Sequence, residues 1–330
     1  MPKITRVQIE NYKSIEKVDF EARRVTVFIG GPNAGKSNIL EALAFLSPGV
    51  GERFSENFRV RQAAELFRDN AIELRPKLLL NGTSAWNLYF DQQNGHFCME
   101  FNFAQMAPKA VFQFSANDVG GSWSSWSGQK ESPCRFFTYR RELFASGRNP
   151  EYGALNAPFG QNLPAILFSD KTLRESVSAL FKSHGFRLEL RPQSSEILIS
   201  KEVNDILYSY PFDGISETLR RIVFYKAVLE TNRDRVLVLD EPEANTFPFY
   251  TKYLAERIAL DETNQFFLTT HNPYVLMSII EKTPKADLAV YVTRMKDYRT
   301  EVRMLTDAEL SEALELSMDL FLNLDRYFPE

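Results

Sequence analysis

The chain has 330 residues, of which 44% are hydrophobic and 25% are charged, a composition typical of globular proteins and unlike that of disordered ones. Its 39 basic and 43 acidic residues give a net charge of −4, so the chain as a whole is not a polycation that attracts nucleic acid. No window approaches the roughly 20 apolar residues of a membrane span, and the first residues lack a signal peptide. We therefore expect a cytoplasmic protein without membrane contact, whose Cys98 and Cys134 are reduced thiols.

The first elements in chain order surround a glycine-rich turn. Residues 4–20 alternate apolar and polar side chains and predict one or two strands with a turn near 11–13. The continuous apolar run at 25–29 is typical of a strand buried on both faces of a sheet. Directly after the glycine-rich turn, apolar residues at helical spacing predict a helix over 38–46.

The middle of the chain has a different pattern of residues. Residues 50–80 are mixed and predict helix or loop. Aromatic, alternating stretches separated by turn residues predict an antiparallel β-meander over about 85–141. A helix is predicted over 163–184, and the stretches 186–190 and 196–200 predict a hairpin.

The last third again alternates helices and strands. An amphipathic helix is predicted over 219–227, two apolar strands over 235–239 and 265–270, a helix over roughly 248–260, and a helical pattern over 307–328. Strands that alternate with helices at both ends of the chain predict an α/β fold with a mostly parallel core sheet. The meander is then an added lobe, next to a helical subregion.

These patterns predict one domain over 1–330. Residues 1–49 and 211–330 form its core, about 85–141 the antiparallel lobe, and about 142–210 a helical and hairpin insertion.

The glycine-rich turn carries the most specific motif of the chain. Gly30 to Ser37, with the sequence GGPNAGKS, fits G-x-x-x-x-G-K-[ST] at every fixed position. In such a loop, main-chain N–H groups and a helix N-terminus bind phosphates. Lys36 is predicted to reach the β- and γ-phosphates of ATP, and the Ser37 hydroxyl to bind Mg²⁺. The predicted nucleotide-binding residues are Gly30, Pro32, Asn33, Ala34, Gly35, Lys36, Ser37 and Asn38.

Two further strand ends carry polar residues. The strand at 235–239 ends in Asp240 and Glu241, whose side chains point in different directions because a strand alternates. We assign Asp240, with Ser37, to binding Mg²⁺ and Glu241 to activating the attacking water. Strands often end in solvated acids, so both assignments depend on the phosphate-binding loop (P-loop) at residues 30–37. His271 follows the strand at 265–270, where Pro273 disfavours a helix start at Asn272. It is predicted to bond the γ-phosphate, so Lys36, Glu241 and His271 form the catalytic set.

The order of these motifs resembles ABC-type ATPase heads of the OLD, RecF and SMC-like group, a class of AAA-family ATPase subunits. The resemblance rests on ITRVQIENYKSIEKVDF, VTVFIGGPNAGKSNILEAL, VLVLDEPEANTFP and LTTHN, covers the chain from end to end, and is weak over about 50–210. It implies an ABC-type head with Mg²⁺ and ATP, which dimerises as an ATP sandwich or forms a higher oligomer.

In such a sandwich a signature helix of one subunit closes on the nucleotide of the other. Residues 214–220, GISETLR, are the candidate by position, with Ser216 as a helix cap that presents its hydroxyl to phosphate. The usual double glycine is missing, and Glu217 places a negative charge there, so either Glu217 points away or closure is weak. Ser216 as an ordinary helix cap is the alternative. The Q-loop residue is not placed, with residues 140–142 and Gln161 as candidates.

The resemblance implies an ATP-hydrolysing dimerisation switch that controls a separate effector. After His271 about 60 residues remain, too few for the nuclease domain of OLD proteins, so we expect a separate nuclease or toxin, as in anti-phage defence pairs or DNA metabolism. The alternative is a non-hydrolysing, nucleotide-dependent scaffold. Lys13 is either a nucleotide contact or part of a surface turn, and DNA binding by the scattered arginines stays open.

Overall fold

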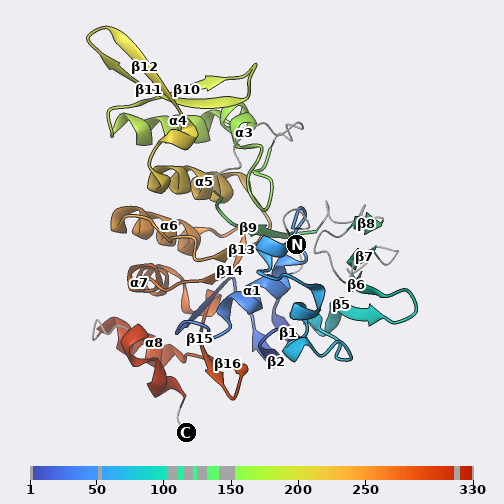
Figure 1. The fold of residues 1–330 in the computed structure, drawn as a ribbon. Helices are drawn as coiled ribbons and strands as arrows, with labels where there is room; N and C mark the ends of the chain where they lie inside the picture. The colour runs from blue at the N-terminus through green and yellow to red at the C-terminus, as the bar shows by residue number, and fades with distance from the viewer. Residues whose placement is uncertain are drawn as a thin grey trace.

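The computed structural model describes residues 3–50, 54–102, 110–114, 122–124, 132–140, 153–315 and 320–328. Within these residues the strands form three sheets, of six, seven and three strands (Figure 1). No helix among them is long and apolar enough to cross a membrane.

The six-stranded sheet is the core of the fold. Its strand order is β16-β15-β3-β14-β13-β9, and all neighbours are parallel except β16, which is antiparallel to β15. The continuous apolar runs become its central strands, which are buried along almost their whole length, as predicted. The bounds are β3 Val25–Gly30, β9 Cys134–Phe137, β13 Val236–Asp240, β14 Gln265–Thr269, β15 Leu288–Lys296 and β16 Arg299–Met304.

The seven-stranded sheet is antiparallel and joins the N-terminal strands to the predicted meander. Its order is β2-β1-β4-β5-β6-β7-β8, so the meander continues the N-terminal hairpin instead of standing as an added lobe. The join is made by β4, whose residues pair with β1 on one side and with β5 on the other. The bounds are β1 Arg6–Tyr12, β2 Ile15–Glu21, β4 Lys77–Leu80, β5 Thr83–Asp91, β6 His96–Phe101, β7 Ala110–Phe114 and β8 Ser122–Ser124.

The predicted meander is wrong at its end. Residues 134–137 form β9, which pairs in parallel with β13 in the core sheet. The neighbours Phe136 and Phe137 are both buried, so the strand is covered on both faces, as a core strand is. An alternating aromatic stretch alone does not distinguish this strand from the half-exposed strands of the meander.

Helix α1 (Lys36–Ala44) lies between the two large sheets. Its apolar residues pack into one cluster with residues of both sheets, among them Ile9, Trp86 and Val238. Trp86 donates its indole N–H to the carbonyl oxygen of Ala42 at 2.8 Å. The P-loop helix is therefore held on both sides.

The opposite face of the core sheet is covered by four helices, α5 (Glu217–Thr231), α6 (Pro248–Leu260), α7 (Pro273–Lys282) and α8 (Asp307–Glu315). They contribute to the second core cluster, which includes residues of β13 and β14.

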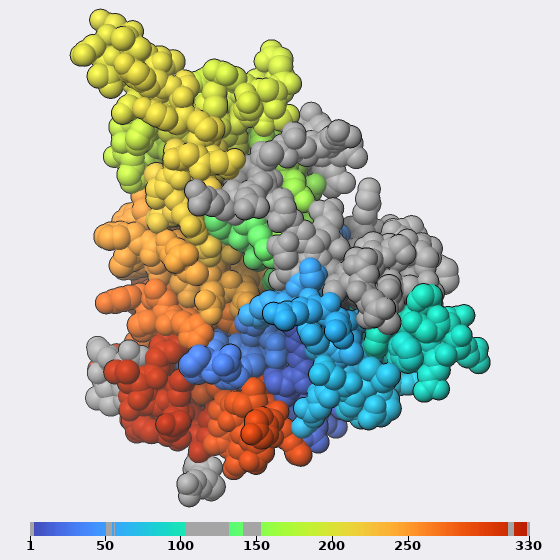
Figure 2. All heavy atoms as spheres, viewed as in Figure 1, coloured from blue at the N-terminus to red at the C-terminus, as the bar shows by residue number. Residues whose placement is uncertain are grey.

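The insertion consists of two helices and a small antiparallel sheet, which projects from the body at the top of Figure 2. The helix predicted over 163–184 is two helices, α3 (Leu163–Ser169) and α4 (Lys171–Lys182), because Asp170 is extended and its carboxylate accepts the N–H of Leu173 at 2.9 Å. The predicted hairpin gains a third strand that we did not predict. The sheet consists of β10 Arg187–Arg191, β11 Glu196–Val203 and β12 Ile206–Pro211.

The C-terminal part contains elements for which we had no prediction, namely α7, β15 and β16. The helical pattern over 307–328 becomes α8 and a 3-10 segment over Leu320–Tyr327. Short helical pieces also occur at α2 (Phe54–Asn57), Ala63–Leu66, Arg68–Asn70, Phe212–Gly214 and Lys285–Asp287. The predicted domain boundaries stay predictions.

Candidate functional site

The P-loop connects β3 to α1, and its backbone requires glycine at Gly35. Gly35 has φ 90°, and a Cβ at this position would lie 2.0 Å from Oγ1 of Thr300. Asn33 is also left-handed, with φ 56°. Pro32 and Asn33 are exposed and Ala34 is buried. The loop thus has the turn geometry in which successive N–H groups converge on an anion.

Lys36 is buried beside this loop and bonded only to neutral groups in the described residues. Its ammonium donates to the carbonyl oxygens of Gly30 at 2.9 Å and Gly31 at 2.8 Å. Burial lowers the pKa of Lys36, while the charges of Glu241 and Asp240 raise it. A buried ammonium without a close anion is what a phosphate group would stabilise.

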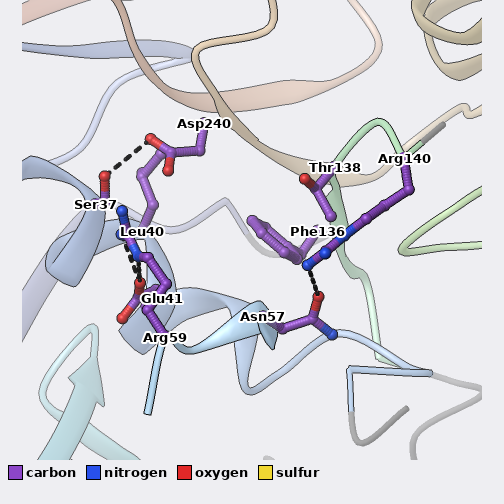
Figure 3. A pocket seen from close by; sticks show the side chains of 9 residues that line it. All are labelled: Ser37, Leu40, Glu41, Asn57, Arg59, Phe136, Thr138, Arg140 and Asp240. Carbon is purple, nitrogen blue, oxygen red and sulfur yellow. Dashed lines mark hydrogen bonds and ion pairs between the residues drawn. The ribbon is translucent and has the colours of Figure 1, made fainter. Parts of the chain in front are cut away.

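Ser37 and Asp240 form the first polar pair of the site (Figure 3). The Ser37 hydroxyl donates to Oδ1 of Asp240 at 3.2 Å, and the Thr269 hydroxyl donates to the same oxygen at 2.5 Å. A hydroxyl and a carboxylate are hard oxygen ligands of the kind Mg²⁺ prefers, and Mg²⁺ commonly takes only one or two protein ligands besides phosphate and water. The Ser37 hydroxyl and the Asp240 carboxylate are thus a pair of oxygen ligands that fits Mg²⁺.

Glu241 and His271 form the second polar pair. Oε1 of Glu241 lies 3.2 Å from Nε2 of His271, and both side chains are 42% exposed. Glu241 has a left-handed backbone, with φ 44°, and its N–H donates to the Thr269 hydroxyl at 3.0 Å. Glu241 follows the last residue of β13, so this left-handed turn, and not the alternation of the strand, sets the direction of its side chain.

The surroundings of His271 favour its neutral form, because they lower the pKa of the imidazole. Burial lowers its pKa most, the charge of Lys36 lowers it further, and the carboxylates of Glu241 and Asp240 raise it. The pKa therefore lies below its ordinary value of 6.5. A neutral imidazole can donate one hydrogen bond and accept another.

The strand register brings the two pairs together. In the core sheet Asp240 is opposite Thr269, and Thr269 is opposite Phe28 near the end of β3. All three strands are parallel, so the P-loop, Asp240 and His271 follow strand ends at one edge of the sheet. This is the edge at which open α/β sheets bind ligands.

Asn38, at the start of α1, faces the N-terminal hairpin. Its side-chain amide donates to the Ser14 hydroxyl at 2.7 Å, and Ser14 in turn bonds the Thr300 hydroxyl at 2.7 Å. This polar chain ties the turn between β1 and β2 and the hairpin of β15 and β16 to the P-loop. Neither Ser14 nor Thr300 was among the predicted residues.

Lys13 lies in the turn between β1 and β2, but its ammonium is paired with an acid inside the protein. It lies 2.5 Å from Oε2 of Glu41, whose side chain is 4% exposed. Arg59 binds the other oxygen of Glu41 at 2.6 Å, and the Tyr12 hydroxyl donates to Oε2 at 3.3 Å. The signal in the sequence was Glu41 itself, a charge within the apolar residues of the helix predicted over 38–46.

The segment after β9 lies opposite Ser37 and Asp240 across a small cavity of about 140 Å³ (Figure 3). Arg140, one Q-loop candidate, reaches across it to the side chain of Asn57 at 3.4 Å. Residues 141 and 142 lie outside the described residues, and Gln161 does not line the cavity. The lining residues are Ser37, Leu40, Glu41, Asn57, Arg59, Phe136, Thr138, Arg140 and Asp240.

The candidate signature lies at the start of α5 but differs from the prediction in its cap. Ser216 occupies the N-cap position and is exposed, yet its side chain makes no capping hydrogen bond. The exposed Glu217 carboxylate accepts from the Asn245 amide at 3.4 Å, and the Thr218 hydroxyl donates to the carbonyl of Asn245 at 2.9 Å. Glu217 is thus directed to a residue of its own chain, on the loop that follows Glu241.

Comparison with known proteins supports this picture at the level of fold. Residues 2–110 match the family model of the AAA ATPase domain, and no curated protein matches the sequence. A crystal structure of an Smc head bound to the C-terminal winged-helix domain of ScpA is similar, with 13% identity, a TM-score of 0.57, and coverage of 94% of this chain and 100% of that one. The Smc head with a coiled coil and joint from Pyrococcus yayanosii has 10% identity, a TM-score of 0.55, and coverage of 96% and 100%.

The chain therefore has the α/β fold of SMC ATPase heads. Its P-loop lies within the part that matches the AAA ATPase domain model, which supports a nucleotide-binding P-loop protein.

Proposed function

We propose that this chain binds Mg²⁺ and ATP, hydrolyses the nucleotide, and acts as a dimerisation switch. The observation that carries the proposal is the arrangement at one edge of the core sheet. A buried ammonium at Lys36, a Ser37–Asp240 pair and a Glu241–His271 contact follow the ends of three adjacent parallel strands. These are the groups that phosphoryl transfer to water requires.

Each group has one role in this proposal. The N–H groups of residues 30–37 and the Lys36 ammonium bind the phosphates, and Ser37 with Asp240 would hold the ion. Bound Mg²⁺ supplies positive charge that offsets the charge of the phosphate oxygens. Glu241 orients the attacking water and accepts its proton. Neutral His271 has one N–H, which it can donate either to Glu241 or to a γ-phosphate oxygen. With nucleotide bound we assign this N–H to the γ-phosphate oxygen, which leaves the Glu241 carboxylate to the water.

The open side of the site supports a dimer. Glu241 and His271 are both 42% exposed, and hydrolysis proceeds best where water is excluded and charges are held in a dry environment. A second copy that lays its α5 N-terminus, with Ser216, on this edge would cover the site. Because the contact with Asn245 holds Glu217 against its own chain, its charge need not face the phosphates.

The readout of the switch is proposed to be a separate effector, a nuclease or a toxin, in anti-phage defence or DNA metabolism. The proposal follows from the resemblance to OLD-type proteins. It is also supported by the similar Smc head, which was crystallised with a domain of another protein, ScpA. The described residues hold no cluster of three or more acidic, histidine or cysteine side chains for a metal-dependent nuclease site of their own.

The test is light scattering after size exclusion, with and without Mg²⁺ and ATP, on wild type, Glu241→Gln and Lys36→Ala. Glu241→Gln should lower the turnover rate by about 10²- to 10⁴-fold, the usual contribution of a general base, and should accumulate an ATP-dependent dimer. Lys36→Ala should neither bind nucleotide nor dimerise. If Glu241→Gln hydrolyses ATP like wild type, Glu241 is not the base. If wild type dimerises with ATP but shows no turnover, the protein is a nucleotide-dependent scaffold.

A further inference from the structure

Glu243 is a buried carboxylic acid near the site to which the proposed mechanism gives no role. It lies on the loop that follows β13, and only 5% of its surface is exposed. One carboxyl oxygen, Oε1, accepts the hydroxyl hydrogen of Thr270, and Oε2 has no hydrogen-bond partner among the described residues. A half-satisfied buried carboxyl costs folding free energy, so an apolar residue would serve the core better.

The partner of Glu243 belongs to the segment that carries His271. Thr270 directly follows β14, and its hydroxyl oxygen also accepts the N–H of Asn272 at 3.0 Å. Thr270 thus holds the backbone on both sides of His271. The main-chain N–H of His271 also lies close enough to the Glu243 carboxyl to affect its pKa.

Glu243, the other partner of the hydrogen bond with Thr270, lies on the loop that carries Glu241. The carbonyl of Glu243 accepts the N–H of Thr246 at 3.1 Å and the Thr246 hydroxyl at 2.5 Å. The loop from 241 to 246 is therefore fixed around Glu243. Since Glu241 and His271 stand on two different loops, their contact depends on how these loops are held together.

We propose that Glu243 is a positioning residue, which sets the contact between Glu241 and His271 by holding the His271 segment through the Thr270 hydroxyl. This inference rests on the proposed function for its catalytic consequence. Its structural consequence, the place of the imidazole beside Glu241, can be measured without any hydrolysis.

The chain offers a clean measurement of that place, because it has only three histidines, His96, His184 and His271. The pKa of each imidazole can be followed by NMR titration of the full-length protein without nucleotide, and His271→Gln assigns the signal. The Glu241 carboxylate raises the pKa of His271, so losing the contact should lower that pKa further. The variants are Glu243→Met, which removes the acceptor of the Thr270 hydroxyl at similar length, and Thr270→Val, which leaves the Glu243 carboxyl in place.

Both variants should lower the pKa of His271 and leave the NMR signals of His96 and His184 in place. They should also lower kcat by about ten- to a hundredfold with KM unchanged, the effect of a misplaced catalytic group. Thr283→Val is the matched control, since Thr283 is a buried threonine at the far end of α7, and it should change neither quantity.

The inference is overturned if His271 titrates as in wild type in both folded variants. It is equally overturned if all three histidines shift together, because that result indicates a general loss of structure. A wild type that does not hydrolyse ATP defeats the proposed function, whereas the titration still decides whether Glu243 places His271.

Discussion

Thr269 contacts both acids of the site, because its hydroxyl donates to Oδ1 of Asp240 at 2.5 Å and accepts the N–H of Glu241 at 3.0 Å. One side chain of the neighbouring strand therefore fixes the carboxylate assigned to the metal and the backbone of the residue assigned to the water. The contact exists because Asp240 and Thr269 are opposite each other in the parallel pair of β13 and β14. Sheet register is thus what sets the geometry of the two acids.

Replacing Thr269 with valine should remove both hydrogen bonds at almost constant volume. We expect turnover to fall by about ten- to a hundredfold, because misplacing a catalytic group by an ångström costs this much. Thr269→Ser keeps the hydroxyl and is the matched control, which should stay close to wild type. Steady-state ATPase assays of both variants decide the matter, and equal activities of the valine and serine variants would show that the hydroxyl has no such role.

Gly35 should tolerate no side chain. A Cβ would lie 2.0 Å from Oγ1 of Thr300, and a φ of 90° is unfavourable for every residue except glycine. Gly35→Ala should therefore abolish binding of a fluorescent ATP analogue. Thr300→Ala in the same chain removes Oγ1 and Cγ2 of Thr300 but leaves its Cβ at 2.9 Å and the backbone strain, so it should restore binding only in part. Full restoration would mean that the conflict with Thr300 is the whole cause.

Part of this site could be predicted from the sequence, because its signals are short local patterns of residues. The apolar runs at 25–29 and 235–239 predicted core strands, and the structure confirms them as β3 and β13. The polar residues that follow them could then be placed at one edge. The same reasoning failed at 134–137, because parallel pairing with β13 is a long-range contact that leaves no periodic pattern in so short a strand.

The contacts that support the site could not be predicted, because they too are long-range contacts. Thr300 and Ser14 meet beside Asn38 only through folding of the C-terminal hairpin onto the N-terminal one. Glu243 was part of the quoted DEPE stretch, but its burial and its bond to Thr270 come from the loop conformation. A sequence pattern identifies which residue types follow a strand, but it does not identify which of them form hydrogen bonds with one another.

Glu41 should be needed for stability. Its carboxylate is 4% exposed and binds Lys13 and Arg59, while Arg59 itself is 58% exposed. Burial lowers the pKa of Lys13, which the charge of Glu41 raises. Glu41→Gln should lower the free energy of unfolding by about 3 kcal/mol, because it leaves a buried ammonium without its partner. Arg59→Ala should cost about 1 kcal/mol or less in the same urea titration. Equal losses in the two variants would contradict this assignment.

Glu243 should make the protein more stable in mild acid. Burial raises the pKa of its carboxyl from the ordinary 4.5 to about 7, against the lowering effect of the Thr270 hydroxyl. Between these two values the folded protein binds a proton that the unfolded chain lacks, so this contribution is complete below pH 4.5 and is lost as pH rises through 7. From pH 7.5 to pH 5.5 the free energy of unfolding of wild type should therefore rise by about 2 kcal/mol relative to Glu243→Gln. Urea titrations of both proteins at the two pH values measure this difference directly. A constant difference between them would show that the carboxyl keeps the same charge in both states, and that burial does not raise its pKa.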